Sequence, residues 1–202
     1  MPADARTTKP RRRGDALTGA IYLATLEELA RTGLEPLAFD RIAAVAGAGK
    51  ASLYRRWATP AELVLAALTD PLTGFGEPTP EPGTGTLRGD LVELLTGLAR
   101  VLEQPHGRAL RPLVAQRERH PELHARVVEL VLAPRQRLLL RVLERAVERG
   151  EADPAAVTPR VATVGPRLVL TEHDHRGPVS AAEVEAIVDE VLLPLAAPRK
   201  RA

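Results

Sequence analysis

Apolar residues recur along this chain at the three- and four-residue intervals of amphipathic helices. No segment alternates apolar and polar residues in the manner of a half-buried strand. A proline at position 134 is expected to kink or break one long stripe. The pattern predicts an all-α protein of about nine helices, over residues 15–32, 39–46, 50–57, 60–69, 87–102, 108–119, 121–150, 154–172 and 180–196.

Two of the short predicted helices are joined by a tight turn, which residues 47–49 form with two glycines. Phe39 and Ile42 lie on one face of the helix before the turn, and Leu53 and Trp57 share a face of the helix after it. Such a pair is a helix-turn-helix, whose second helix can enter the major groove of DNA. The alternative is an ordinary αα-hairpin with a solvated basic face.

The second helix of this pair has the chemistry of a DNA reader. Lysine and arginine can bind phosphates or guanine edges, and serine or tyrosine hydroxyls can reach a phosphate or a base. Small residues near the helix start let the backbone approach the bases. The predicted DNA contacts are Lys50, Ala51, Ser52, Tyr54 and Arg55, supported by Arg41 and Arg56.

The residues from Leu17 to Leu68, with the segments FDRIAAVAG, KASLYRRW and PAELVLAAL, resemble the DNA-binding domain of the TetR family of transcriptional regulators. The resemblance implies an N-terminal three-helix helix-turn-helix domain and a C-terminal helical domain for dimerisation and regulation. Three positions depart from the family pattern. Ala38, Gly49 and Pro60 stand where residues that cap a helix or touch a phosphate are usual.

Composition adds domain boundaries to this picture. The first 14 residues are basic and lack periodicity, so we expect a disordered arm in which Arg12 and Arg13 reach DNA phosphates or the minor groove. Proline and glycine are concentrated after residue 70, as in a linker. The expected organisation is a basic arm at 1–14, a helix-turn-helix domain at 15–70, a linker at 71–86, a ligand-binding and dimerisation domain at 87–197 and a basic tail at 198–202.

Other features exclude whole classes of protein. The net charge is only +2, cysteine is absent, and no apolar run is long enough to cross a membrane. Disulfides and thiolate metal sites are therefore excluded, and we expect a cytoplasmic protein without a signal peptide.

The family resemblance further implies a homodimer that binds a palindromic operator in double-stranded DNA, and a repressor that a small-molecule effector releases. Phe75 is the only aromatic residue beyond the helix-turn-helix, so an aliphatic or anionic effector is expected. The candidate polar residues around it are Arg111, Gln116, His120, His124, Arg167 and His173. A regulator without an effector, either constitutive or controlled by a partner, is the alternative.

Histidines raise the question of a metal enzyme. His120 and His124 are four residues apart, but Pro121 is expected to start a helix and to place His120 at its cap. Residues 173–175, with the sequence HDH, precede Arg-Gly-Pro and are expected in a loop. We therefore predict no metal site, no cofactor and no enzymatic activity.

Overall fold

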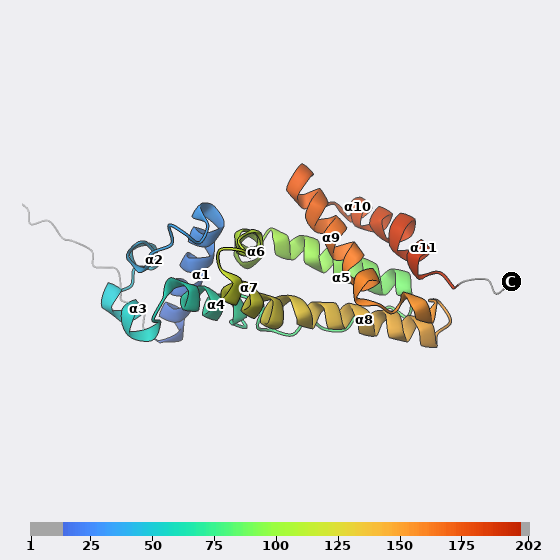
Figure 1. Ribbon diagram of the computed structural model, residues 1–202, viewed down its shortest axis with the longest axis horizontal. Helices are drawn as coiled ribbons and strands as arrows, with labels where there is room; N and C mark the ends of the chain where they lie inside the picture. Colours follow the sequence, from blue (N-terminus) through green and yellow to red (C-terminus); the bar gives the residue numbers. More distant parts are fainter. Residues whose placement is uncertain (1–13, 199–202) are drawn as a thin grey trace, which may run out of the picture.

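The computed structural model describes residues 14–198, and every regular element within them is helical (Figure 1). The α-helices are α1 (Asp15–Thr32), α2 (Phe39–Ala46), α3 (Lys50–Arg56), α4 (Pro60–Thr69), α5 (Leu87–Leu102), α6 (Pro105–Ala115), α7 (Pro121–Val127), α8 (Ala133–Glu148), α9 (Pro159–Arg176), α10 (Ala181–Ile187) and α11 (Leu193–Ala196). Two π-helical turns, η1 (Val128–Leu132) and η3 (Val188–Leu192), and one 3₁₀ turn, η2 (Pro154–Ala156), complete them. The predicted all-α class is confirmed.

The two π-helical turns join short helices into continuous rods. α7 runs through η1 into α8, and α10 runs through η3 into α11, so the described chain has nine helices. In each rod a proline, Pro134 or Pro194, stands at the second residue after the wide turn. Proline lacks an N–H and crowds the carbonyl four residues earlier, and a widened turn relieves both problems. The helix therefore continues past Pro134, where a kink or break was predicted.

Four predicted boundaries were wrong, the two ends of α6 and the two ends of α9. α6 begins at Pro105, where proline takes the first helical position, and it ends at Ala115. α9 begins at Pro159 after the cap of Thr158, and it continues to Arg176, so residues 173–175 are helical and not a loop. At the start of α9 the hydroxyl of Thr158 accepts the N–H of Val161, and this cap satisfies a free N–H group of the first turn.

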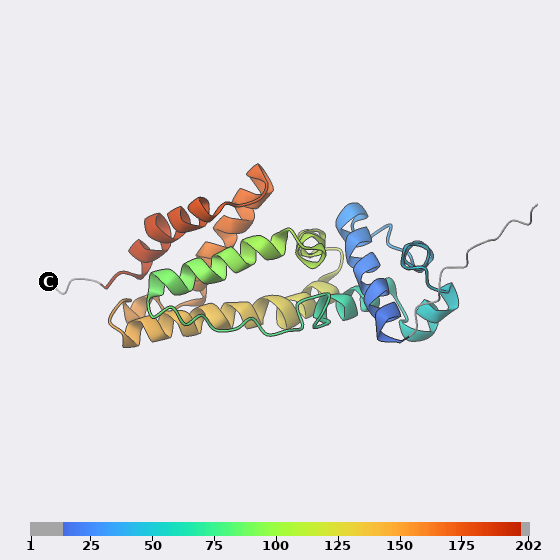
Figure 2. The same ribbon diagram turned by 180° about the vertical axis from the view of Figure 1, so that it is seen from behind.

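Two hydrophobic cores hold the helices together. The first contains side chains of α1 to α4, and it also takes Ala109 and Leu113 from α6 and Val127 and Val131 from α7 and η1. The second lies among α5, α8, α9, α10 and η3. Figures 1 and 2 show α6 beside α1, between the two groups of helices. The first core thus joins segments on both sides of residues 71–86, so the two parts of the chain are packed against each other.

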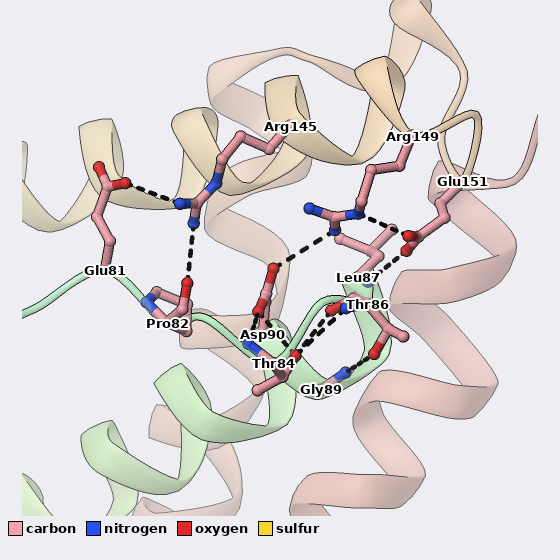
Figure 3. A network of polar contacts seen from close by, with 10 residues as sticks. All are labelled: Glu81, Pro82, Thr84, Thr86, Leu87, Gly89, Asp90, Arg145, Arg149 and Glu151. Atoms are coloured by element: carbon pink, nitrogen blue, oxygen red, sulfur yellow. Dashed lines mark hydrogen bonds and ion pairs between the residues drawn. The ribbon is translucent and has the colours of Figure 1, made fainter.

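The segment 71–86 has a fixed path along α8 (Figure 2). Glu81 accepts hydrogen bonds from Arg141 and Arg145, and Arg145 also donates to the carbonyl of Pro82 at 3.2 Å. Asp90, which is 1% exposed, accepts bonds from the backbone and hydroxyl of Thr84, as Figure 3 shows. A segment that is rich in proline and glycine is thereby held in one conformation by charged groups of the neighbouring helix.

Candidate nucleic-acid interface

The turn between α2 and α3 has the geometry of a helix-turn-helix. Gly47 ends α2 in the left-handed conformation, with φ 66°, which favours glycine. Leu53 is the buried residue of α3, and Phe39 of α2 contacts the ring of Tyr54 edge to face, with 4.9 Å between ring centroids. The remaining surface of α3 is thus free to face a ligand.

Some of the predicted DNA-contact residues have side chains without a polar partner in the protein, and others are paired with residues of neighbouring helices. Tyr54 is 61% exposed, and Ala51 and Arg55 are exposed as well, while Ser52 is half-buried. Among residues 14–198, the guanidinium of Arg55 has no hydrogen-bond or ion-pair partner. These four side chains can meet the edges of bases or phosphates without first breaking a hydrogen bond or an ion pair.

The other predicted basic contacts have partners within the protein. Lys50 Nζ lies 2.6 Å from Asp40 Oδ2, but both side chains are exposed, and such a pair is worth about 0–1 kcal/mol. Arg56 donates to Thr18 Oγ1 at 2.9 Å and lies over the ring of Trp57. Lys50 can therefore exchange its carboxylate for a phosphate, whereas Arg56 holds the end of α3 against α1.

Arg41 joins α2 to a buried carboxylate of α1. Its Nη1 donates to Glu28 Oε1 at 2.9 Å, and Arg31 donates to both oxygens of Glu28 through Nη2. Glu28 is 6% exposed. The hydrogen bond from Arg31, and after it the bond from Arg41, lower the pKa of Glu28 although burial alone would raise it. Sequence reasoning missed Glu28, because the only signal for it was an acidic residue on the apolar side of the first helix.

The lowered pKa of Glu28 predicts how the stability of the protein depends on pH. Its folded pKa is below the ordinary 4.5, so the unfolded chain binds more protons between the two values. Glu28 therefore contributes its full stabilisation above the pKa that it has in the unfolded chain. This stabilisation is lost as the pH falls through the pKa of Glu28 in the folded protein. We expect the unfolding free energy, measured by urea denaturation between about pH 3 and 6, to fall less steeply with acid in Glu28→Gln. Equal slopes in both proteins would contradict this assignment.

The starts of α2, α3 and α4 differ in whether a side chain caps them. Ala38 and Gly49 make no side-chain cap for α2 and α3, while Thr59 Oγ1 accepts from the N–H of Glu62 at the start of α4. The predicted contacts Arg12 and Arg13 lie outside the described residues.

The six residues predicted around an effector do not surround one cavity. Arg111 and His173 both lie near the carboxylate of Asp174, which is 3.2 Å from Arg111 Nε. His173 Nε2 also lies 2.8 Å from Glu103. Gln116 and His120 lie beside the end of α1, where His120 Nε2 is 3.5 Å from Glu35. His124 is half-buried on α7, and Arg167 is exposed on α9.

None of these six residues lines either of two hollows that lie within residues 14–198. One, between α5, α8, α9 and η3, is walled by aliphatic residues and has a volume of about 10 Å³, room for about one water. The other is a groove of about 420 Å³ between segment 71–86 and α8. Across residues 14–198 no three potential metal ligands gather, and no helix there has the length and hydrophobicity to cross a membrane.

Comparison with known proteins now decides the family. A model described as bacterial regulatory proteins, tetR family, matches residues 21–67, and one described as a tetracyclin repressor-like C-terminal domain matches residues 81–191. The chain belongs to the TetR family of transcriptional regulators. The predicted family is confirmed, and members of the TetR family are regulators of transcription and not enzymes.

Similar proteins extend over most of the chain. An uncharacterised HTH-type transcriptional regulator of Mycobacterium tuberculosis is 34% identical over 175 residues, which cover 86% of this chain and 85% of that protein. The DNA-binding transcriptional repressor TetR of Mycobacteroides abscessus is 32% identical over 190 residues, covering 94% and 98%.

Solved structures show the same fold. The TetR family transcription regulator SCO0332 matches with a TM-score of 0.60 and 27% identity, over 91% of this chain and 100% of that chain. Salmonella enterica GusR matches with a TM-score of 0.62 over 94% and 99%, and at 15% identity it supports the fold alone.

Proposed function

We propose that this TetR-family regulator is a cytoplasmic repressor that binds a palindromic operator as a homodimer. The observation that carries the proposal is α3, a helix with one buried residue whose outward side chains include Tyr54 and the unpaired Arg55. A planar guanidinium can bind a guanine edge at two points, and a tyrosine hydroxyl can bond a phosphate. The similar protein of Mycobacteroides abscessus, described as a repressor, supports the sign of regulation.

Dimerisation in this proposal uses α9, α10 and α11. These helices lie together on one side of the second core (Figure 1), and they expose Leu170 and Leu195. A two-fold axis through this surface would relate two copies of α3, so that the two copies read the two halves of an inverted repeat.

The experiment is recovery of bound fragments from the source genome, followed by a salt titration of the best fragment. We expect an enriched inverted repeat and an affinity that falls steeply with salt, since each phosphate contact releases a counterion. Binding without sequence preference would contradict the proposed operator.

Substitutions in α3 test which residues read the operator. We expect Arg55→Ala and Tyr54→Ala each to weaken operator binding by about tenfold or more, because a base or phosphate contact of this kind is worth about 1–3 kcal/mol. Lys50→Ala should weaken binding less and reduce its salt dependence. The matched control is Arg117→Ala, another exposed arginine, which lies between α6 and α7. Circular dichroism must show that the variants keep their helicity. Full operator affinity in both Arg55→Ala and Tyr54→Ala would refute the assignment of α3 as the helix that reads the operator.

We also propose that a small molecule releases the operator, since differential affinity for two conformations is enough to change DNA binding. The alternative, a regulator without an effector, is favoured by the cavity of only about 10 Å³ in the second core. The open groove beside α8 favours an effector. A thermal-shift screen separates the two, since a ligand of the folded state raises the melting temperature.

A further inference from the structure

The groove of about 420 Å³ between segment 71–86 and α8 has room for a small molecule. One wall is segment 71–86, from Phe75 to Thr79, and the other is the face of α8 that contains Pro134, Leu138 and Arg141. The end of α4, at Thr69, closes one side. None of the predicted effector residues lies here, so this groove was not expected from the sequence.

The groove has a basic wall of three arginines against one acidic residue, Glu77. Arg137 is exposed, and its guanidinium has no partner within residues 14–198. Arg135 donates to the carbonyl of Val131 at 2.7 Å and to that of Phe75 at 3.5 Å, which together occupy only part of its five N–H groups, and burial lowers its pKa. Arg141 is held at the rim by Glu81. An anion beside Arg135 and Arg137 would offset the free-energy cost of burying the guanidinium of Arg135. It would also give the guanidinium of Arg137 an ion-pair partner.

The floor of the groove is apolar. Phe75 and Leu138 are 8% and 4% exposed, and Leu130 and Pro134 lie beside them, half-buried. We propose that the groove binds an amphipathic anion, with a carboxylate or phosphate head group at Arg135 and Arg137 and an aliphatic body over this floor. Its regulatory role rests on the operator binding proposed above.

The contacts around Phe75 connect such a ligand to the DNA reader. The N–H of Phe75 donates to the carbonyl of Leu68 in α4 at 2.6 Å, and its ring contacts both the ring of His106 in α6, edge to face, and the guanidinium of Arg135. Gly76 is equally close to α4, because an added Cβ would lie 2.0 Å from the carbonyl oxygen of Thr69. A head group that draws Arg135 away from Phe75 would therefore loosen the contact between segment 71–86 and α4, which leads directly to α3.

The test uses the full chain and three probes: octanoate, octyl phosphate and uncharged octan-1-ol. Calorimetric titration is expected to show saturable binding of at least one anion and much weaker binding of the alcohol. Comparison of the two anions identifies the head group. Arg137→Gln should weaken anion binding by about tenfold or more, because a charged hydrogen bond is lost. The control Arg117→Gln, at an exposed arginine outside the groove, should leave it unchanged.

A second variant tests the location without touching an arginine. Thr79→Trp would fill the groove from its exposed rim, and we expect it to abolish anion binding while the unfolding midpoint in urea stays that of the parent. Absence of saturable binding by either anion, or undiminished binding in Thr79→Trp and Arg137→Gln, would overturn the site.

The regulatory role has its own readout. Saturation with the bound anion should weaken operator binding by about 5- to 150-fold in the parent and not in Thr79→Trp. Unchanged operator affinity would overturn the coupling. If no operator exists, the proposed function fails, whereas the calorimetric result on the protein alone still decides whether the groove binds anions.

Discussion

Replacing Leu53 with alanine is expected to lower the unfolding free energy by about 2–5 kcal/mol and to abolish operator binding. Leu53 is fully buried, and it is the buried residue of α3. A helix of seven residues is not stable by itself, and Gly49 provides no side-chain cap at its start. The position of α3 therefore depends on packing, in which Leu53 and the neighbouring Trp57 are the anchors.

The Leu53→Ala result is measured by urea denaturation and by operator titration of the same samples. Val45→Ala is the control, since Val45 is an exposed apolar residue of α2 and should change stability by no more than about 0.5 kcal/mol. A loss below about 1 kcal/mol in Leu53→Ala would mean that the site collapses around the smaller side chain, contrary to the close packing inferred here.

Replacing Asp90 with alanine is expected to cost about 1.5–3 kcal/mol. Its carboxylate accepts from the N–H and hydroxyl of Thr84 at 3.0 and 2.8 Å, and Arg149 Nη2 lies 3.4 Å away (Figure 3). Alanine would leave the N–H of Thr84 without its acceptor, while the hydroxyl of Thr84 would keep only the carbonyl of Thr86, at 3.1 Å. The end of segment 71–86 should then become mobile, which hydrogen exchange at Thr84 and Thr86 would detect.

Asp90→Asn separates the hydrogen bonds from the charge. The amide keeps one oxygen for Thr84 and loses the attraction to Arg149, so we expect a smaller loss of stability than in Asp90→Ala. Glu93→Ala, at an exposed position of the same helix, is the control. Equal stability of Asp90→Ala and Glu93→Ala would show that the network in Figure 3 contributes little.

Local sequence patterns were enough to predict most helices and the helix-turn-helix. The apolar spacing from Phe39 to Trp57, with glycines at 47 and 49, has few physical solutions other than two short helices and a turn. Capping is also local, and Thr59 and Ser180 accept the N–H groups of the residues three positions later at the starts of α4 and α10. Errors occurred at Pro134 and at residues 173–175, where residues that often end helices were accommodated within them.

The candidate site was predictable only in part. Sequence identified the side chains on α3, because a short helix with one apolar face must expose the others. It did not separate Arg55, which has no partner in the described chain, from Arg41 and Arg56, which Glu28 and Thr18 hold. Those partners come from α1, and pairing between distant segments is invisible to local patterns.

The sequence by itself determined the all-α class, the family and the helix-turn-helix pair of short helices, since these depend on the periodicity and residue types of short segments. Only the tertiary structure decided that α6 and α7 pack in the first core, that Glu28 joins α1 to α2 and that segment 71–86 forms a groove with α8. Each of these depends on which faces meet after folding. Burial and charge pairing between segments far apart in the chain set that outcome, and no local pattern encodes it.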